Sequence, residues 1–211
     1  MSPTASRRPG RPPAAKADET RRRILHAARQ VFSERGYDGA TFQAIAVRAD
    51  LTRPAINHYF SSKRVLYREV EDQTNELVTA AGIERAKRET TLMGRLTAFI
   101  SAAMRANSEN SSASAFLITA VLESQRRPEL GRTENDAVRT SREFLTRVVN
   151  DAIERGEVAA DIDASALVET LLVVLCGVGF YVGYLRSYQE MEAVIEMLRQ
   201  LLEGALWRPE T

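Results

Sequence analysis

The chain has 211 residues, 44% of them apolar and 27% charged, which is enough to bury a core and argues against fibrous and wholly disordered proteins. One cysteine, Cys176, and two histidines, His26 and His58, exclude an intrachain disulfide and a four-cysteine zinc site. The net charge of +1 conceals a separation, because residues 1–67 hold 13 Lys and Arg against 5 Asp and Glu, whereas the rest hold 16 against 23. This separation indicates a nucleic-acid-binding head on an acidic body, although a solvated surface without a partner has the same composition.

Residues 1–17 are expected to form a disordered basic arm, because they contain four prolines and no apolar periodicity. Arg7, Arg8 and Arg11 surround a Pro-Gly pair in this arm, a composition suited to a DNA minor groove and equally to a solubilising leader. The arm has no apolar segment of the kind found in secretory signals, so we expect a cytoplasmic protein.

From Asp18 or Thr20 to Gly36 the apolar residues recur with helical spacing. The expected inner face contains Ile24, Ala27, Ala28, Val31 and Phe32. Three arginines, residues 21–23, lie in the first turns, where the helix dipole favours anions instead. Their placement is consistent with a polyanion nearby.

Residues 41–64 predict two short helices joined by a tight turn. Thr41 is a good N-cap for a helix of about eight residues whose inner face holds Phe42, Ile45, Ala46 and Ala49. After a turn at residues 49–51, Thr52 caps a second helix with Pro54 in its first turn. Ile56 and Phe60 are expected to point inward. The pattern is typical of a helix-turn-helix.

The outward residues of the second helix suit the major groove of DNA. Arg53 can pair with guanine, Asn57 with adenine, and the Ala55 methyl can contact a thymine methyl. Ser61 or Ser62 is expected to cap the next helix, whose free amides and Lys63 suit a phosphate.

With these motifs, ILHAARQVFSERGYDGATFQAIAVRAD followed by LTRPAINHYFSSKRVLY, the sequence resembles the tetracycline-repressor (TetR) family of bacterial transcription regulators from about Arg22 to Tyr67. Asp50 replaces the usual turn glycine, and Asn57 replaces the usual aromatic residue of the recognition helix. The resemblance implies base contacts by Gln43, Arg53, Pro54 and Ala55, and backbone contacts by Thr41, Thr52, Asn57, His58, Tyr59 and Lys63. It also implies a dimeric fold.

Beyond Tyr67 the apolar spacing predicts further helices and no alternating strand pattern. We expect an all-α protein of about nine helices, with a helix-turn-helix head over residues 18–67 and an effector-binding and dimerisation domain over residues 68–211. Candidate walls of an effector cavity are aromatic residues and a methionine, each also a candidate for plain core. They are Met93, Phe99, Phe116, Phe144 and Tyr181.

The run from Leu171 to Leu185 is apolar all round and contains three glycines. At 15 residues it is short for a membrane span, so we expect no membrane partner. Burial against a second subunit explains both features, and ordinary intrachain core is the alternative. The expected dimer residues are Leu175, Gly179, Gly183, Leu198 and Leu202.

No catalytic set, metal-ligand spacing or cofactor motif emerges, since Cys176 lies in the apolar run and the glycines lack the strand that a dinucleotide motif requires. The hypothesis is therefore a homodimeric repressor, not an enzyme, that leaves a palindromic operator when it binds a small effector. The alternatives are an activator of the same fold, a nonspecific DNA-coating protein and, remotely, a helical enzyme.

Overall fold

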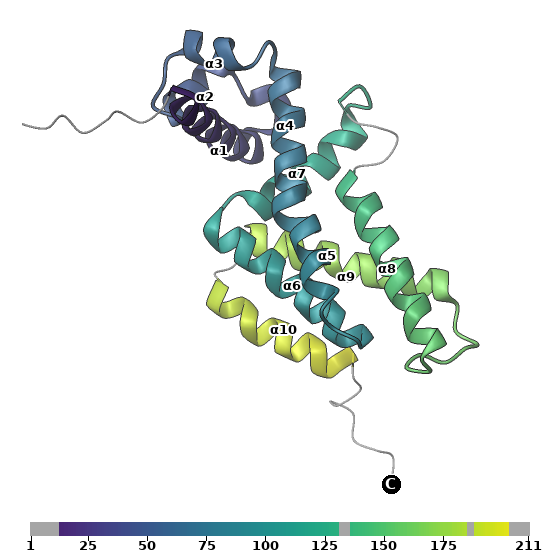
Figure 1. The fold of residues 1–211 in the computed structure, drawn as a ribbon. Helices are drawn as coiled ribbons and strands as arrows, with labels where there is room; N and C mark the ends of the chain where they lie inside the picture. The colour runs from purple at the N-terminus through teal and green to yellow at the C-terminus, as the bar shows by residue number, and fades with distance from the viewer. Residues whose placement is uncertain (1–12, 131–135, 185–187, 203–211) are drawn as a thin grey trace, which may run out of the picture.

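A computed structural model describes residues 13–130, 136–184 and 188–202, and Figure 1 shows their arrangement. The described residues form helices and no strands. In chain order the elements are α1 (Pro13–Gly39), α2 (Phe42–Arg48), α3 (Arg53–Tyr59), α4 (Lys63–Asn75), the π-helical turn η1 (Glu76–Ala80), α5 (Ala81–Ala86), α6 (Leu92–Glu109), α7 (Ala113–Arg126), α8 (Asp136–Glu154), α9 (Ala164–Tyr184) and α10 (Tyr188–Leu202). With α4, η1 and α5 counted as one rod, nine helices result in the described part of the chain, as the sequence predicts.

The head consists of α1, α2, α3 and the first turns of α4, at the top of Figure 1. Its core is closed by the residues expected to point inward: Ile24, Val31, Phe32, Ile45, Ile56 and Phe60 are each at most 1% exposed. Phe116 and Ala120 of α7 belong to the same core. The head therefore rests directly on α7 of the body.

Helix α1 differs from the sequence prediction at both ends. It begins at Pro13, within the segment expected to be disordered, because proline fits the first turn of a helix and the alanines and lysine that follow favour helix. Arg7, Arg8 and Arg11 lie outside the described residues. At the other end Gly36 has φ 65° and ψ −177°, so the helix bends there and makes one last turn to Gly39.

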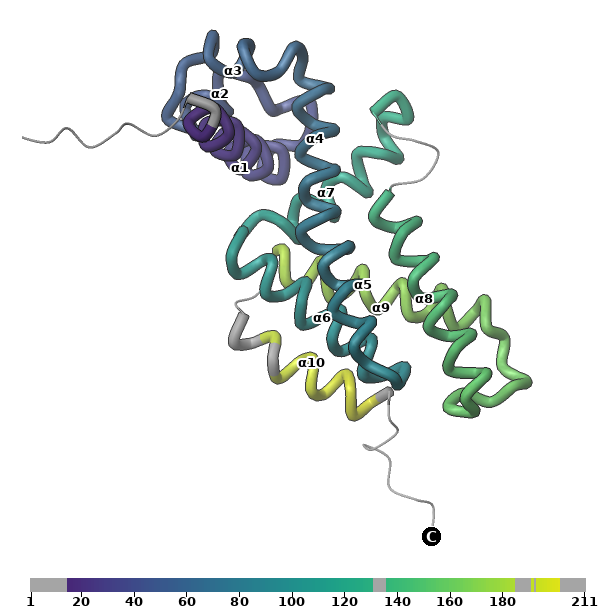
Figure 2. The backbone as a smooth tube through the Cα atoms, in the orientation of Figure 1, coloured from purple at the N-terminus to yellow at the C-terminus, as the bar shows by residue number. Residues whose placement is uncertain are grey.

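One long rod connects head and body, because α4 continues through η1 into α5 (Figure 2). The apolar spacing of residues 64–88 predicts this rod but not its π-helical turn. Val78 and Thr79 of that turn are buried among the body helices. A π turn interrupts the regular hydrogen bonding of a helix and is common at functional positions.

In the body, α5, α6, α8 and α9 pack around one apolar cluster, and α6, α9 and α10 pack around a second. Helix α7 joins a smaller cluster with η1 and α6, and α10 lies against α6. Helix α9 remains largely uncovered: in its 21 residues only Val168, Leu171 and Leu172 are buried. By length and composition α9 could cross a membrane, which is weak evidence because core helices of soluble proteins pass the same test.

The expected dimer residues on α9 face this chain's own helices. A Cβ on Gly183 would lie 2.7 Å from the Ala115 backbone nitrogen of α7, and one on Gly179 would lie 3.8 Å from Ile118. Leu175 packs among two body clusters. The close approach inferred from these glycines is thus intrachain, since an all-apolar helix gives no sign of which side meets which neighbour. Leu198 is half-buried beside Ile195, and the side chain of Leu202 lies outside the described part.

Candidate nucleic-acid interface

The two short helices of the head begin as their N-cap residues predict. The Thr41 hydroxyl accepts a hydrogen bond from the Ala44 amide at 3.1 Å, and the Thr52 hydroxyl accepts one from the Ala55 amide at 3.4 Å. Ser62 does the same for α4, accepting from the Val65 amide at 3.2 Å. Helices of seven residues are unstable alone, so these caps and one buried isoleucine in each helix hold them in place.

The turn between α2 and α3 depends on Asp50, which has φ 52° and occupies the left-handed region where glycine is usual. Arg23 of α1 stabilises this turn by donating to the carbonyl oxygens of Ala49 at 2.7 Å and Asp50 at 3.3 Å. Arg23 therefore supports the helix-turn-helix from behind, a role that the sequence does not reveal because the two segments are distant in the chain.

The residues with implied base contacts lie on the outer surface of the head. Gln43, Arg53 and Pro54 are exposed, and Ala55 is half-buried. Among the residues with implied backbone contacts, Thr41, Thr52, Asn57 and His58 are exposed, and Tyr59 is half-buried with its ring against His58 at 5.3 Å. These side chains therefore lie exposed or half-buried on the head, where a ligand can reach them.

Only part of the positive charge of the head is available to a polyanion. Arg48 forms a two-bond pair with Glu34, both bonds at 2.8 Å. Arg21 pairs with Glu69 and lies over the Phe60 ring. By contrast Arg53 and Arg64 are exposed and have no hydrogen bond or ion pair to any residue that the structure describes. Two of the three consecutive arginines at residues 21–23, Arg21 and Arg23, therefore have structural partners; because α1 begins at Pro13, all three lie inside the helix and not in its first turn as the sequence predicted.

Arg29 is 1% exposed and is the largest fully buried side chain among the described residues. It donates to Thr74 at 3.0 Å, Gln73 at 2.6 Å and Asn110 at 3.3 Å, and its burial lowers the pKa of its guanidinium. The three acceptors belong to α4 and to the end of α6. Arg29 consequently ties α1 to the long rod and to the body.

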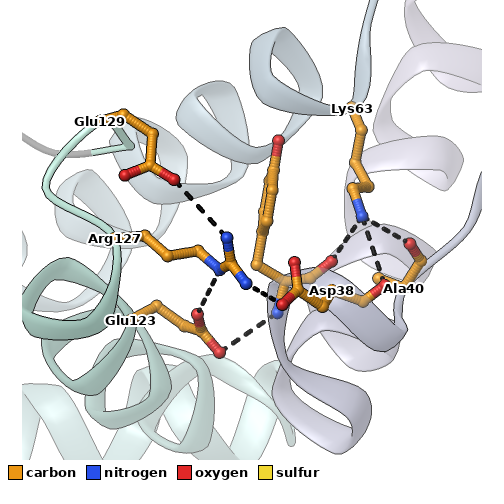
Figure 3. Close-up of polar contacts among 7 residues, drawn as sticks. Asp38, Ala40, Lys63, Glu123, Arg127 and Glu129 are labelled. Atoms are coloured by element: carbon orange, nitrogen blue, oxygen red, sulfur yellow. Dashed lines mark hydrogen bonds and ion pairs between the residues drawn. The ribbon is translucent and has the colours of Figure 1, made fainter.

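Lys63 is occupied within the chain rather than extended into solvent (Figure 3). Its ammonium donates to the carbonyl oxygens of Tyr37 at 2.7 Å, Ala40 at 3.1 Å and Asp38 at 3.4 Å, and it lies 4.4 Å from the centre of the Tyr37 ring. Partial burial lowers the pKa of Lys63. The implied phosphate contact of Lys63 would require these bonds to be exchanged for a phosphate.

The body contains an apolar cavity of about 100 Å³ bounded by η1, α6, α7, α8 and α9. Of the expected wall residues, Phe99 lines it. Phe144 does not line the cavity but stacks on Phe99, with ring centres 5.4 Å apart. Met93 lines a gap beside α10, and Tyr181 packs against the apolar cluster between α6 and α10. Phe116 lies in the core of the head. The spacing of apolar residues along one helix does not show which neighbouring helix each side chain contacts. The sequence therefore could not distinguish cavity-lining residues from core residues.

The cavity walls carry few polar groups and no charged side chain. Thr79, Ser114, Ser141 and Cys176 supply the polar atoms, and burial raises the pKa of the Cys176 thiol. Within the described ranges no group of three His, Cys, Asp or Glu residues is placed to hold a metal ion. The cavity can therefore accept an uncharged apolar group.

Comparisons with known proteins agree with this geometry. Residues 24–70 match the family profile "Bacterial regulatory proteins, tetR family", and residues 87–177 match "Tetracyclin repressor-like, C-terminal domain". The HTH-type transcriptional regulator SrpR of Pseudomonas putida is 30% identical over 202 residues, covering 92% of this chain and 86% of SrpR.

Two solved structures share the fold. The regulator PfmR from Thermus thermophilus has a TM-score of 0.70 at 23% identity, covering 89% of this chain and 97% of PfmR. AibR, solved with isovaleryl coenzyme A and operator DNA, has a TM-score of 0.69 at 16% identity, covering 86% of this chain and 97% of AibR.

Proposed function

Because this chain belongs to the TetR family of bacterial transcription regulators, we propose that it acts as a homodimeric repressor that binds a palindromic operator and leaves it when the apolar chain of a small-molecule effector enters the body. The observation that carries the proposal is the set of exposed polar side chains on α2 and α3, among them Gln43, Arg53 and Asn57, on a head with a closed apolar core of its own.

DNA binding follows from the chemistry of that surface. Arg53 at the start of α3 is free to form a two-bond contact with guanine, and Asn57 one turn later can pair with adenine. The capped first turns of α2 and α4 add backbone amides near Thr41 and Ser62 that suit phosphates. These groups together provide both base recognition and positioning on the duplex.

Dimerisation is supported by an uncovered apolar face on α9 and α10. Val173 is 71% exposed, Phe180 47% and Met197 53%, and these exposed apolar side chains gather on two neighbouring stretches of helix. Gly177 on the same helix has open space beside it. A second copy with the same face would cover these residues and set two recognition helices one duplex turn apart. A dimer of this kind belongs in the cytoplasm rather than in a membrane.

The effector proposal depends on the cavity. The cavity has a volume of about 100 Å³ and almost entirely apolar walls, which suits a short aliphatic group. AibR was solved with isovaleryl coenzyme A, whose acyl part is short, branched and apolar. We therefore propose an effector with a short apolar chain that occupies this cavity.

Selection of bound duplexes from a random pool tests the DNA part. We expect an inverted repeat, bound at least about 10³-fold more tightly than a scrambled duplex of the same length. Equal binding of both duplexes would instead indicate a nonspecific coating protein.

Two further measurements separate the remaining alternatives. Transcription from a promoter that carries the selected repeat should rise when the gene is deleted, whereas an activator would give a fall. Isovaleryl coenzyme A, added to the preformed complex, should release the duplex, and coenzyme A without the acyl chain should not.

A further inference from the structure

The end of α1 lies in a polar network that joins the head to α7 of the body (Figure 3). The Glu123 carboxylate accepts a hydrogen bond from the Tyr37 amide at 3.3 Å. Arg127, one turn later on α7, pairs with Asp38 and lies with its Nε 3.7 Å from Glu123. Residues 37 and 38 are thus held by two side chains of the body.

The bend at Gly36 makes this contact possible. Gly36 leaves the helical conformation, and the amide of Tyr37 directly after it donates to the Glu123 carboxylate. The carboxylate of Glu123 fills the place beside Gly36, where a Cβ would lie only 2.7 Å from its Oε1. A negative group at the start of a helical turn is also favoured by the backbone dipoles.

Glu123 itself is 7% exposed, an unusual position for a carboxylate on an otherwise accessible helix end. Removing a charged group from water is costly, so such groups persist where hydrogen bonds and opposite charges hold them in one place. The arrangement therefore fixes a direction as well as a distance between α1 and α7.

Besides this network and the hydrogen bond from Arg29 to Asn110 at 3.3 Å, the head meets the body through apolar packing and the covalent connection, which constrain orientation less. Phe116 packs in the core of the head, 5.6 Å from the ring of Tyr67 and 6.5 Å from that of Phe32, but apolar packing is non-directional. The covalent connection runs through the π-helical turn η1, where regular helical bonding is interrupted. Directional bonds at residues 37 and 38 complement both.

We propose that Glu123 is a positioning residue for operator recognition: it fixes the angle of the head on the body and thereby the separation of the two recognition helices in the dimer. This inference rests on the proposed function, because a separation has meaning only for a dimer on a two-part operator. Lys63 holds the same turn from the side of the head, so the turn transmits the position of α7 to Thr41 and α2.

Helix α7 also supplies Ser114, Ile118 and Val121 to the wall of the apolar cavity. Glu123 follows Val121 by two residues, so a ligand that displaces this part of α7 moves the carboxylate with it. The network lies on the helix that connects the cavity to the head.

The test measures spacing preference rather than affinity alone. Using the inverted repeat selected by the wild-type protein, we compare its affinity with that for duplexes whose half-sites are one or two base pairs further apart. The wild-type dimer should prefer its own spacing at least about tenfold, since each added base pair rotates and shifts one half-site. Glu123→Ala should reduce this preference to less than about threefold, while the variant remains folded and dimeric.

Glu123→Gln retains an acceptor for the Tyr37 amide but loses the charge that faces Arg127, so its spacing preference should fall between those of wild type and Glu123→Ala. The matched control is Glu129→Gln, which removes the same charge from a side chain that is 60% exposed and 3.5 Å from the same arginine. It should keep the wild-type preference.

Wild-type spacing preference in folded, dimeric Glu123→Ala would overturn the inference. If that variant does not fold, Glu123→Gln and Arg127→Gln decide, because wild-type preference in both would also overturn it. A wild-type protein that binds no inverted repeat specifically contradicts the proposed function instead, and that result is seen before any variant is made.

Discussion

Helices α3 and α9 show opposite relations between composition and burial. Helix α3 has seven residues and only one of them, Ile56, is buried, yet its end caps and its inner side find their partners within the chain itself. Helix α9 has 21 residues, nearly all apolar, but only three of them are buried. The short helix presents polar groups to a ligand from a satisfied core, while the long one retains apolar surface that a single chain leaves exposed.

The strongest test of this contrast removes the apolar face of α9. Phe180→Glu places a charge on a side chain that is 47% exposed, so the single chain should still fold, whereas a dimer would have to bury that charge. We expect a sedimentation mass of one chain. Operator affinity should fall by at least about 100-fold, because each head then binds its half-site alone.

Ile162→Glu is the control for Phe180→Glu, since Ile162 is 43% exposed but precedes the start of α9. It should sediment as a dimer and bind normally. If Phe180→Glu sediments with the same mass as the wild-type protein, the apolar face of α9 is not a dimer interface. The contrast with α3 would then say nothing about function.

Gly36→Ala tests whether the head depends on the body as well as on its own core. Alanine is strained at φ 65°, and its Cβ would lie 2.7 Å from the Glu123 carboxylate. We expect the free energy of unfolding to fall by about 2–3 kcal/mol, measured by chemical denaturation. Gly156→Ala isolates the strain, because Gly156 has φ 74° and no neighbouring atom within 4 Å, and should cost about 1 kcal/mol. Equal losses of unfolding free energy in the two variants would mean that the Glu123 carboxylate moves away from the new methyl group without a measurable cost.

Arg53→Ala tests the exposed side of α3 without touching its core. We expect discrimination at one base pair of the operator to fall by about 1–3 kcal/mol while thermal stability is unchanged, because Arg53 has no partner among the described residues. Affinities for duplexes substituted at each position measure this. A uniform loss across all duplexes would assign Arg53 to the phosphates.

The sequence predicts the head well because its signals are local. The N-caps Thr41 and Thr52, the left-handed Asp50 and the inward Ile56 each depend on neighbours within a few residues, and all four have the expected conformation or burial. The predicted start of α1 was wrong, because the helix propensity of the alanines and lysine after Pro13 outweighs the disorder expected from the composition of the arm.

The rest could not be predicted, because it depends on contacts between distant segments. Arg23 ends a run of three arginines and Arg29 follows six residues later, and only the fold shows that they hold a turn and a helix junction. Likewise the apolar pattern of α9 shows that the helix needs cover but not which side α7 supplies. Gly183 faces α7, and Val173 does not.

Lys63 provides the finest distinction between the structural and the DNA-binding residues of the head. Its family resemblance implies a phosphate contact, for which Lys63→Ala would lower the slope of log affinity against log salt by about 1. Its three carbonyl partners at the end of α1 imply instead a loss of about 1–2 kcal/mol in unfolding free energy with the salt slope unchanged. Lys63→Met, which keeps the apolar stem over Tyr37 but donates no hydrogen bond, separates packing from bonding. A lower salt slope with the wild-type free energy of unfolding would show that Lys63 contacts DNA phosphates. A lower free energy of unfolding with the wild-type salt slope would show that Lys63, like Glu123, holds the turn at the end of α1.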